Sequence, residues 1–215
     1  MLASSSRSVW IREKLNDVRA MAGKVFRRSW FRYFSREETP TAWERVIQVW
    51  DTAYDEDEGA DWSVCMTLGL VGGRVYVLDV FRERLAFPRL VPAVMGLWRR
   101  WRPERVLVEE KASGKSAIQV LQAETTAPVV GVSPGGKDKT TRARAVTVYL
   151  ESGRVLFAEG ATWLDGFEDE LVLFPEGAFD DQVDVLVYGL LELMVGDGEE
   201  ETVTESRVIQ RVAGF

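Results

Sequence analysis

The segment that most constrains the fold is a short apolar run, VIQVWDTAY, at residues 46–54. Its β-branched and aromatic residues predict a buried β-strand that ends on a carboxylate, Asp51. No Lys or Arg lies within three residues of Asp51 in the sequence. Because a buried carboxylate needs a positive group near it, we expect Asp51 to face a metal ion. A strand-end Asp can also simply cap the following turn, so this hypothesis depends on the other acids of the chain.

The absence of histidine excludes several kinds of active site. The chain of 215 residues has no His and a single cysteine, Cys65, which removes Ser-His-Asp and Cys-His catalysis, histidine-ligated zinc and disulfide bonds. Any chemistry must therefore use carboxylates, hydroxyls, lysines and bound metal. The cysteine content indicates a reducing, cytosolic setting, and the net charge of -7 means that a nucleic-acid partner would need a local basic patch. No apolar run approaches the roughly 20 residues of a membrane span, and no signal peptide is recognisable.

The order of the predicted elements indicates an α/β fold with a mixed sheet. Strands are expected at residues 46–51, 62–71, 74–81, 106–110, 128–132 and 154–159. Helices are expected at residues 87–101, 115–123, 163–174 and 179–194, with one more that follows a loop at 133–144 and ends near residue 151. The first three strands should be antiparallel, and the later ones, which alternate with helices, should be parallel. This pattern predicts helices on both faces, with the first and fourth strands side by side near the middle of the sheet, where ligands gather at the carboxyl ends.

The predicted domain covers residues 45–196. Residues 1–44, which include a possible helix at 9–21, are expected to form an N-terminal arm or linker, and residues 197–215 a flexible, polar C-terminal tail. The segment at 24–34 interleaves arginines with aromatic residues. Such interleaving can indicate stacking on nucleic acid, but we expect the aromatic side chains to pack on the domain while the arginines stay in solvent.

Two of the predicted strands end in carboxylates. The first ends at Asp51, and the strand at 106–110 ends in Glu109 and Glu110, between which the alternation of side chains does not choose. Because these two strands are expected to be neighbours, we expect their terminal acids to lie close together.

The last predicted helix begins with three more acids, Asp180, Asp181 and Asp184. Residues 181 and 184 share one face of a helix, as do residues 180 and 184. Acids in a first turn also suit the helix dipole, so on their own they do not indicate a metal. Three or more carboxylates gathered at one site, however, repel one another unless a divalent cation neutralises them.

Ligation by oxygen alone favours magnesium or manganese over zinc. Two such ions about 4 Å apart would let one activate water while the other stabilises the leaving oxygen of an in-line phosphodiester displacement. This mechanism needs no histidine, which fits the composition.

Three blocks of the sequence, WDTAYDEDEGADWSV, VLVEEKASGKSAIQVL and FPEGAFDDQVDVLVYGL, resemble the nuclease domain of the large terminase subunit of tailed bacteriophages. That family has an RNase H-like fold of the retroviral integrase superfamily. The blocks occur in the order and spacing of the family, and the resemblance extends over residues 24–195. It implies a metal-dependent endonuclease that cuts concatemeric double-stranded DNA at the start and end of genome packaging.

The resemblance also implies roles for individual residues. Asp51 matches the first catalytic acid, and Glu109, five residues before the motif glycine Gly114, matches the second. The third comes from the Asp-Asp pair, of which we favour Asp181, with Asp180 and Asp184 as additional metal ligands. The residue before the pair is usually a His in this family, and here it is Phe179.

DNA is expected to reach these acids over a positively charged rim. The candidate phosphate contacts are Lys111, Lys115, Lys137, Lys139, Arg142 and Arg144. Contacts of this kind give affinity without reading the base sequence. The alternative is that they are only the solvated residues of a loop and of two helix starts.

The family also carries an N-terminal packaging ATPase, to which no part of this sequence corresponds. The segment ASGKS at 112–116 resembles the end of a phosphate-binding loop, but Glu109 stands where that loop requires glycine, so ATP should not bind. The partners implied are double-stranded DNA, a packaging ATPase domain or subunit, the portal and the small terminase, in the host cytoplasm. We expect the isolated domain to be monomeric.

Three other functions are possible for a scaffold of this kind. A RuvC-like junction resolvase or a cellular ribonuclease H would use the same metal chemistry on a different substrate. A non-catalytic docking module for the portal or small terminase would use the same scaffold, with the acids as mere surface. A sugar-kinase or actin-like nucleotide binder needs glycine-rich turns after the first strand, and WDTAY contains none.

Overall fold

A computed structural model describes residues 25–53, 62–133, 136 and 138–195. The expected helix at 9–21 and the C-terminal tail lie outside these residues. None of the helices within the described ranges combines the length and apolar character needed to cross a membrane.

Seven strands form one mixed sheet, in the order β1-β7-β4-β3-β2-β5-β6. The strands are β1 (Arg32–Phe34), β2 (Arg45–Asp51), β3 (Ser63–Val71), β4 (Arg74–Glu83), β5 (Arg105–Glu109), β6 (Val129–Val132) and β7 (Val155–Ala158). Neighbours within β2, β3 and β4 are antiparallel, while β5, β6, β7 and β1 join the sheet by parallel pairing. The predicted mixed sheet is therefore confirmed, including the pairing of β2 with β5, although β3 rather than this pair lies at its middle because β7 and β1 extend the sheet beyond β4.

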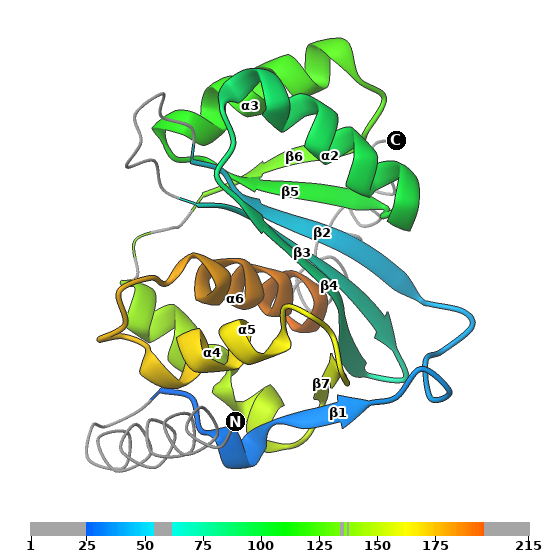
Figure 1. Ribbon diagram of the computed structural model, residues 1–215, viewed down its shortest axis with the longest axis vertical. Helices are drawn as coiled ribbons and strands as arrows, with labels where there is room; N and C mark the ends of the chain where they lie inside the picture. Colours follow the sequence, from blue (N-terminus) through cyan, green and yellow to red (C-terminus); the bar gives the residue numbers. More distant parts are fainter. Residues whose placement is uncertain (1–24, 54–61, 134–135, 137, 196–215) are drawn as a thin grey trace, which may run out of the picture.

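Helices cover both faces of the sheet, as expected (Figure 1). They are α2 (Phe87–Trp101), α3 (Ala112–Glu124), α4 (Lys139–Glu151), α5 (Leu164–Leu173) and α6 (Asp181–Met194), with a short 3-10 helix η1 (Arg28–Trp30). One apolar core lies between the sheet and α2 and α3, and a larger one lies between the sheet and α4, α5 and α6. The candidate metal site described below lies at the strand ends, between these two layers of helices.

Two local features differ from the sequence-based expectation. The segment at 133–144 is expected to be a loop, but α4 already begins at Lys139. Asp138 is the reason, because its carboxylate accepts a hydrogen bond from the backbone N–H of Thr141 and so caps the helix. The second feature is β1, a strand of the predicted N-terminal arm that pairs with β7 at the edge of the sheet.

Three aromatic residues of this N-terminal segment pack on the domain, as predicted, whereas Tyr33 is 43% exposed. Phe26, Phe31 and Phe34 are buried, whereas Arg27 and Arg32 are exposed. The boundary placed between residues 44 and 45 remains a prediction, but residues 25–34 contribute to the sheet and its core.

Gly189 allows α6 to lie directly against the centre of the sheet. A Cβ atom added there would lie 2.1 Å from Cδ1 of Leu68 on β3 and 3.3 Å from Cγ2 of Val49 on β2. Both side chains are fully buried, so neither can swing into solvent to make room. This close approach sets how near α6 brings its own side chains to the strand ends.

We expect Gly189→Ala to lower the free energy of unfolding by roughly 1–3 kcal/mol, because it overpacks the core, although alanine is the better helix former. The matched control is Gly96→Ala on α2, where nothing lies within 4 Å of the added Cβ. That change should stabilise the protein by roughly 0.5–1 kcal/mol. Urea unfolding followed by tryptophan fluorescence measures both, and equal stability of the two variants would contradict the packing described.

Candidate metal centre

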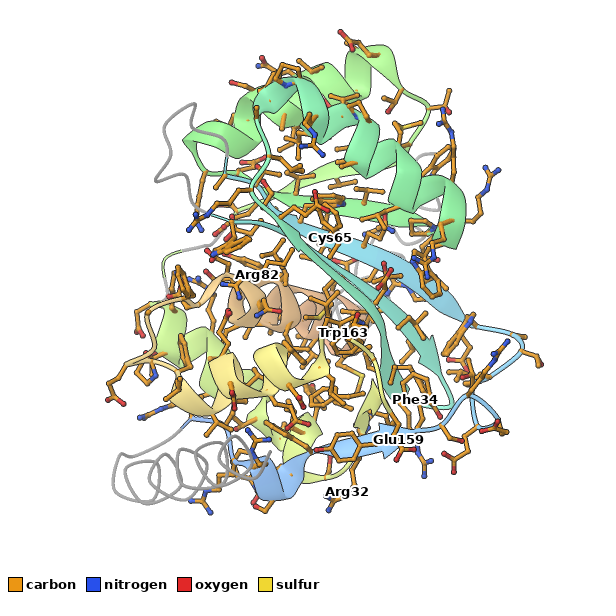
Figure 2. All side chains as sticks on the ribbon, viewed as in Figure 1. Arg32, Phe34, Cys65, Arg82, Glu159 and Trp163 are labelled. Atoms are coloured by element: carbon orange, nitrogen blue, oxygen red, sulfur yellow. The ribbon has the colours of Figure 1, made fainter. Side chains whose placement is uncertain are left out.

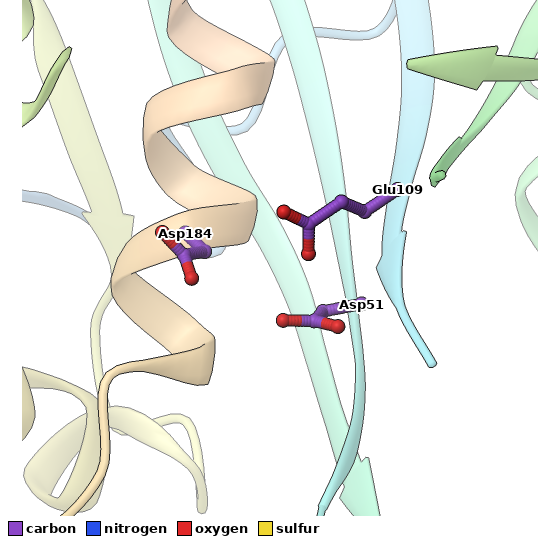
Figure 3. Close-up of side chains that lie close together, drawn as sticks. All are labelled: Asp51, Glu109 and Asp184. Atoms are coloured by element: carbon purple, nitrogen blue, oxygen red, sulfur yellow. The ribbon is translucent and has the colours of Figure 1, made fainter. Parts of the chain in front are cut away.

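The sheet register brings the first two acids together. Trp50 on β2 pairs with Val108 on the parallel strand β5, so the next residues, Asp51 and Glu109, end neighbouring strands on the same face. That face is covered by α6, whose first turn carries Asp184. Figure 3 shows the three carboxylates pointing toward one another from β2, β5 and α6.

These three acids form a compact, buried group of oxygen ligands. One carboxylate oxygen from each of Asp51, Glu109 and Asp184 lies within 4.8 Å of the others. The residues are only 4%, 2% and 4% exposed. Burial raises the pKa of Asp51 to about 7, with Lys111 opposing and Glu109 adding to the rise, and burial also raises the pKa of Asp184. Such a group is costly to ionise unless a cation lies within it.

The choice between Glu109 and Glu110, which the sequence pattern left open, follows from where each side chain lies. Glu109 is buried in the acid group, while Glu110 is exposed and rests against Gly131 of β6. Gly114 has a structural role nearby, because a Cβ atom there would lie 1.8 Å from the carbonyl oxygen of Glu109. Any larger residue at position 114 would therefore push the start of α3 away from the end of β5.

The structure brings Asp184 into the acid group and leaves Asp180 and Asp181 beside it. Asp180 receives hydrogen bonds of 2.9 Å from Lys139 at both carboxylate oxygens. Burial, together with the charges of Glu170 and Asp180, raises the pKa of Asp181 to about 6. The assignment of Asp181 as third catalytic acid thus remains a prediction, and the geometry favours Asp184 for that place.

Two lysines form ion pairs with the acids. Nζ of Lys111 lies 2.6 Å from Glu109, 3.0 Å from Asp51 and 3.9 Å from Asp184. Nζ of Lys139 lies 2.6 Å from Asp184 and 2.9 Å from Asp180. Burial lowers the pKa of both lysines, but the adjacent carboxylates outweigh it, so both pKa values are raised. The sequence analysis placed Lys111 and Lys139 on the DNA-binding rim and did not predict these ion pairs.

Tyr188 and Arg142 fix the orientation of the acids. The Tyr188 hydroxyl, one turn after Asp184 on α6, donates a 2.8 Å hydrogen bond to Oε1 of Glu109. Arg142 of α4 is only 9% exposed, lies 3.8 Å from Asp184 and stacks over the ring of Tyr188. The sequence analysis missed Tyr188, although its i+4 spacing from Asp184 places it on the same helix face.

The other predicted DNA contacts do not share one environment. Lys115 and Arg144 are exposed, as a contact to phosphate requires, whereas Arg142 lies inside the site. Lys137 is outside the described residues. The rim expected from the sequence is therefore divided between exposed residues and residues that balance charge within the site.

The residues present fit a hard divalent cation. The group contains only carboxylate oxygens, its members are buried, and Oε2 of Glu109 and Oδ2 of Asp184 have no hydrogen-bond donor among the described residues, apart from the lysine ion pairs. Oxygen donors of this kind suit magnesium or manganese.

Known proteins with similar sequences or structures identify the family. A family model for the terminase RNaseH-like domain matches residues 48–193. No curated protein matches significantly. A large terminase from a thermophilic bacteriophage, in its crystal form 2, superposes with a TM-score of 0.60 at 13% identity, over 79% of this chain and 43% of that chain.

Two isolated nuclease domains superpose similarly. The P22 large terminase nuclease domain gives a TM-score of 0.57 at 16% identity, over 78% of this chain and 91% of that chain. The large terminase nuclease from thermophilic phage G20c, with bound zinc, gives a TM-score of 0.55 at 18% identity, over 75% of this chain and 94% of that chain.

These comparisons agree with the fold. The chain spans less than half the length of the first of these structures, the large terminase in crystal form 2, whereas the family model covers well over half of this chain. The chain belongs to the terminase RNase H-like domain family, and its fold is that of phage large-terminase nuclease domains.

Proposed function

We propose that this domain is a metal-dependent endonuclease that hydrolyses phosphodiester bonds of double-stranded DNA during phage genome packaging. The observation that carries the proposal is the convergence of three buried carboxylates, Asp51, Glu109 and Asp184, at the carboxyl edge of the sheet. Membership of the terminase RNase H-like domain family and similarity to solved terminase nuclease domains support it.

In this mechanism, Asp51, Glu109 and Asp184 hold two magnesium or manganese ions, with Asp180 and Asp181 as further ligands at the edge of the site. Bound ions of this kind activate water and stabilise the charge on a leaving oxygen. Tyr188 holds one oxygen of Glu109 and so directs the other into the site. Arg142 limits the movement of Asp184, since it packs between that acid and the Tyr188 ring.

The lysines act as exchangeable counter-ions. Lys111 and Lys139 neutralise the acids before metal binds, and their side chains are 42% and 39% exposed, so both can turn outward. If the acids held metal, the ammonium groups of Lys111 and Lys139 could contact DNA phosphates instead, together with the exposed Lys115 and Arg144. Lys137 is proposed as a further phosphate contact, whereas Arg142 is buried in the site. The exposed contacts give affinity that does not depend on the base sequence.

The assembly around this domain is also part of the proposal. The chain spans less than half of a large terminase with the same fold, so we propose that a packaging ATPase domain or subunit, the portal and the small terminase act with it in the host cytoplasm. The ATPase would move DNA, and this domain would cut it.

The acid assignment is tested by paired glutamine and asparagine variants. Because a lost metal ligand should cost more than the roughly 10–100-fold lost when its outer partners are removed, Glu109→Gln and Asp184→Asn should nearly abolish plasmid cleavage in manganese. Glu110→Gln, one residue along but pointing away from the acids, should keep wild-type activity. Cleavage is measured by conversion of supercoiled plasmid to nicked and linear forms, with circular dichroism to verify the fold.

Asp181→Asn decides between the two candidates for the third acid. It should reduce cleavage less than Asp184→Asn does, and the reverse order would favour Asp181 as the third acid.

Digestion of linear duplex, a four-way junction and an RNA:DNA hybrid side by side tests the substrate. Preference for the junction or the hybrid would contradict a packaging nuclease.

The counter-ion role of Lys111 predicts an effect on stability. Lys111→Gln leaves Asp51 and Glu109 facing each other without an ammonium group between them. The free energy of unfolding of the metal-free protein should therefore fall by roughly 1–2 kcal/mol, a value already reduced because the lysine is partly exposed. Manganese should then raise its melting temperature more than it does for the wild type. Lys115→Gln, on the exposed side of the same helix start, is the control, and equal melting of the two variants in EDTA would refute the role.

The raised acid pKa predicts how metal-free stability depends on pH. Asp51 has a folded pKa of about 7, against an ordinary 3.8, so between these values the folded state binds more protons than the unfolded state. Its stabilising effect is complete at low pH and is lost as the pH rises through about 7. In EDTA, the melting temperature of the wild type relative to Asp51→Asn should therefore fall between about pH 4 and pH 7 and level off above that range. A difference in melting temperature that does not change with pH would contradict the raised pKa of Asp51.

A further inference from the structure

A cluster of aromatic and arginine side chains lies on the β4 side of the acid group. We call it the aromatic–arginine cluster and define it as Trp62, Arg82, Arg84 and Phe179. The Arg82 guanidinium lies 4.7 Å from the centre of the Trp62 ring and 5.0 Å from the centre of the Phe179 ring. The Arg84 guanidinium lies 4.7 Å from the same Trp62 ring. The three segments before β3, at the end of β4 and before α6 therefore meet at this point.

The sheet register places this cluster next to the acids. Asp51 pairs with Val64 on β3, and Val64 pairs with Arg82 on β4, so Asp51 and Arg82 occupy one row across three strands. Residues in one row point to the same face, and two strand spacings separate them by about 10 Å. Figure 2 shows Arg82 near the end of β4, beside α6. Phe179 stands only two residues before Asp181, where the Arg82 charge partly offsets the burial that raises the pKa of the Asp181 carboxyl.

The geometry of Arg82 keeps the rings in place. Besides stacking on Trp62 and Phe179, Arg82 lies 3.5 Å from Glu170, a buried acid of α5 that accepts two hydrogen bonds from Gln182 at the start of α6. Arg82 thus links β4, α5 and α6, and it holds the Phe179 ring beside the acids. Phe179 is nevertheless 45% exposed, so part of its ring is left open to solvent.

We propose that the aromatic–arginine cluster binds nucleobases that become unpaired where the duplex opens beside the bond to be cut. The inference rests on the proposed nuclease function and adds a substrate state to it. An open aromatic face stacks on any base, and guanidinium groups add favourable contacts to bases and phosphates. Lys111 and Lys115, which follow β5, would contact only phosphates. The two sides of the acid group would therefore recognise different parts of the DNA.

Paired duplex does not offer base faces to a side chain, whereas an opened duplex does. Stacking on one base changes affinity by about five- to a hundredfold. We therefore expect this protein to bind a duplex with a short unpaired bubble at least about fivefold more tightly than the fully paired duplex. The preference should depend on the π-face at position 179 rather than on its apolar bulk.

The test uses the full chain in EDTA, which prevents cleavage, and fluorescein-labelled DNA followed by anisotropy. The probes are one duplex and the same duplex with a four-base mismatch, chosen at about this size to expose a few bases. Phe179→Leu keeps the apolar contact with Arg82 but removes the π-face, and it should abolish the preference for the bubble while changing duplex affinity less than about twofold. Phe179→Trp should retain the preference. Tyr33→Leu, which removes a similarly exposed aromatic ring (43%) from the edge strand β1, is the control and should behave as the wild type.

Equal binding of both probes by the wild type would overturn the proposal, as would an undiminished preference in Phe179→Leu. Plasmid cleavage in manganese, measured on the same preparations, separates this result from the nuclease assignment. Cleavage without a bubble preference rejects only the stacking surface. A bubble preference that Phe179→Leu abolishes supports the surface even where no cleavage is seen, and the nuclease proposal would then fail by itself.

Discussion

Electrostatic repulsion among buried carboxylates is the constraint on which the rest of the site depends. Asp51 and Glu109 end adjacent parallel strands on one face, and Asp184 approaches them from α6. Three negative charges within a few ångströms and out of contact with water destabilise the fold unless protons or cations balance them. The protein uses both, because Asp51 has a raised pKa and Lys111 lies among the acids. Under the proposed function, a bound divalent cation would supply a stronger compensating charge.

Two glycines make this concentration of charge possible by letting backbones come close. Gly114 allows α3 to begin against the carbonyl of Glu109, and Gly189 allows α6 to lie on Leu68 and Val49. Tyr188 then ties α6 to the end of β5 through its hydrogen bond to Glu109. The acids are therefore positioned by packing between rigid elements, which suits a site that must hold its ligands in fixed geometry.

The charges around the acids are divided by position. Lys111 and Lys139 lie within ion-pair distance of the acids, while Arg82 and Arg84 are stacked on aromatic rings on the β4 side. A stacked guanidinium keeps its charge but is held in place, whereas a half-exposed lysine can turn from acid to phosphate. Under the proposed function, this division would let a chain with a net charge of -7 present positive groups to DNA beside its buried acids.

The sequence by itself determined the class of fold and the chemistry of the site. Periodicity was sufficient for the three antiparallel strands, and the absence of histidine together with the strand-end acids was sufficient for an oxygen-ligand metal hypothesis. These features are local, so a linear pattern records them.

Only the tertiary structure decided which acids meet. Glu109 and Glu110 are equivalent in a strand pattern until the pairing with β2 and β6 assigns one to each face. Asp184 joins the group because α6 lies directly against the sheet, where Gly189 allows the close approach to Leu68 and Val49. The lysine counter-ions, Tyr188 and the stacked Arg82 were missed for the same reason, since each depends on partners far away in the chain whose distance no local pattern encodes.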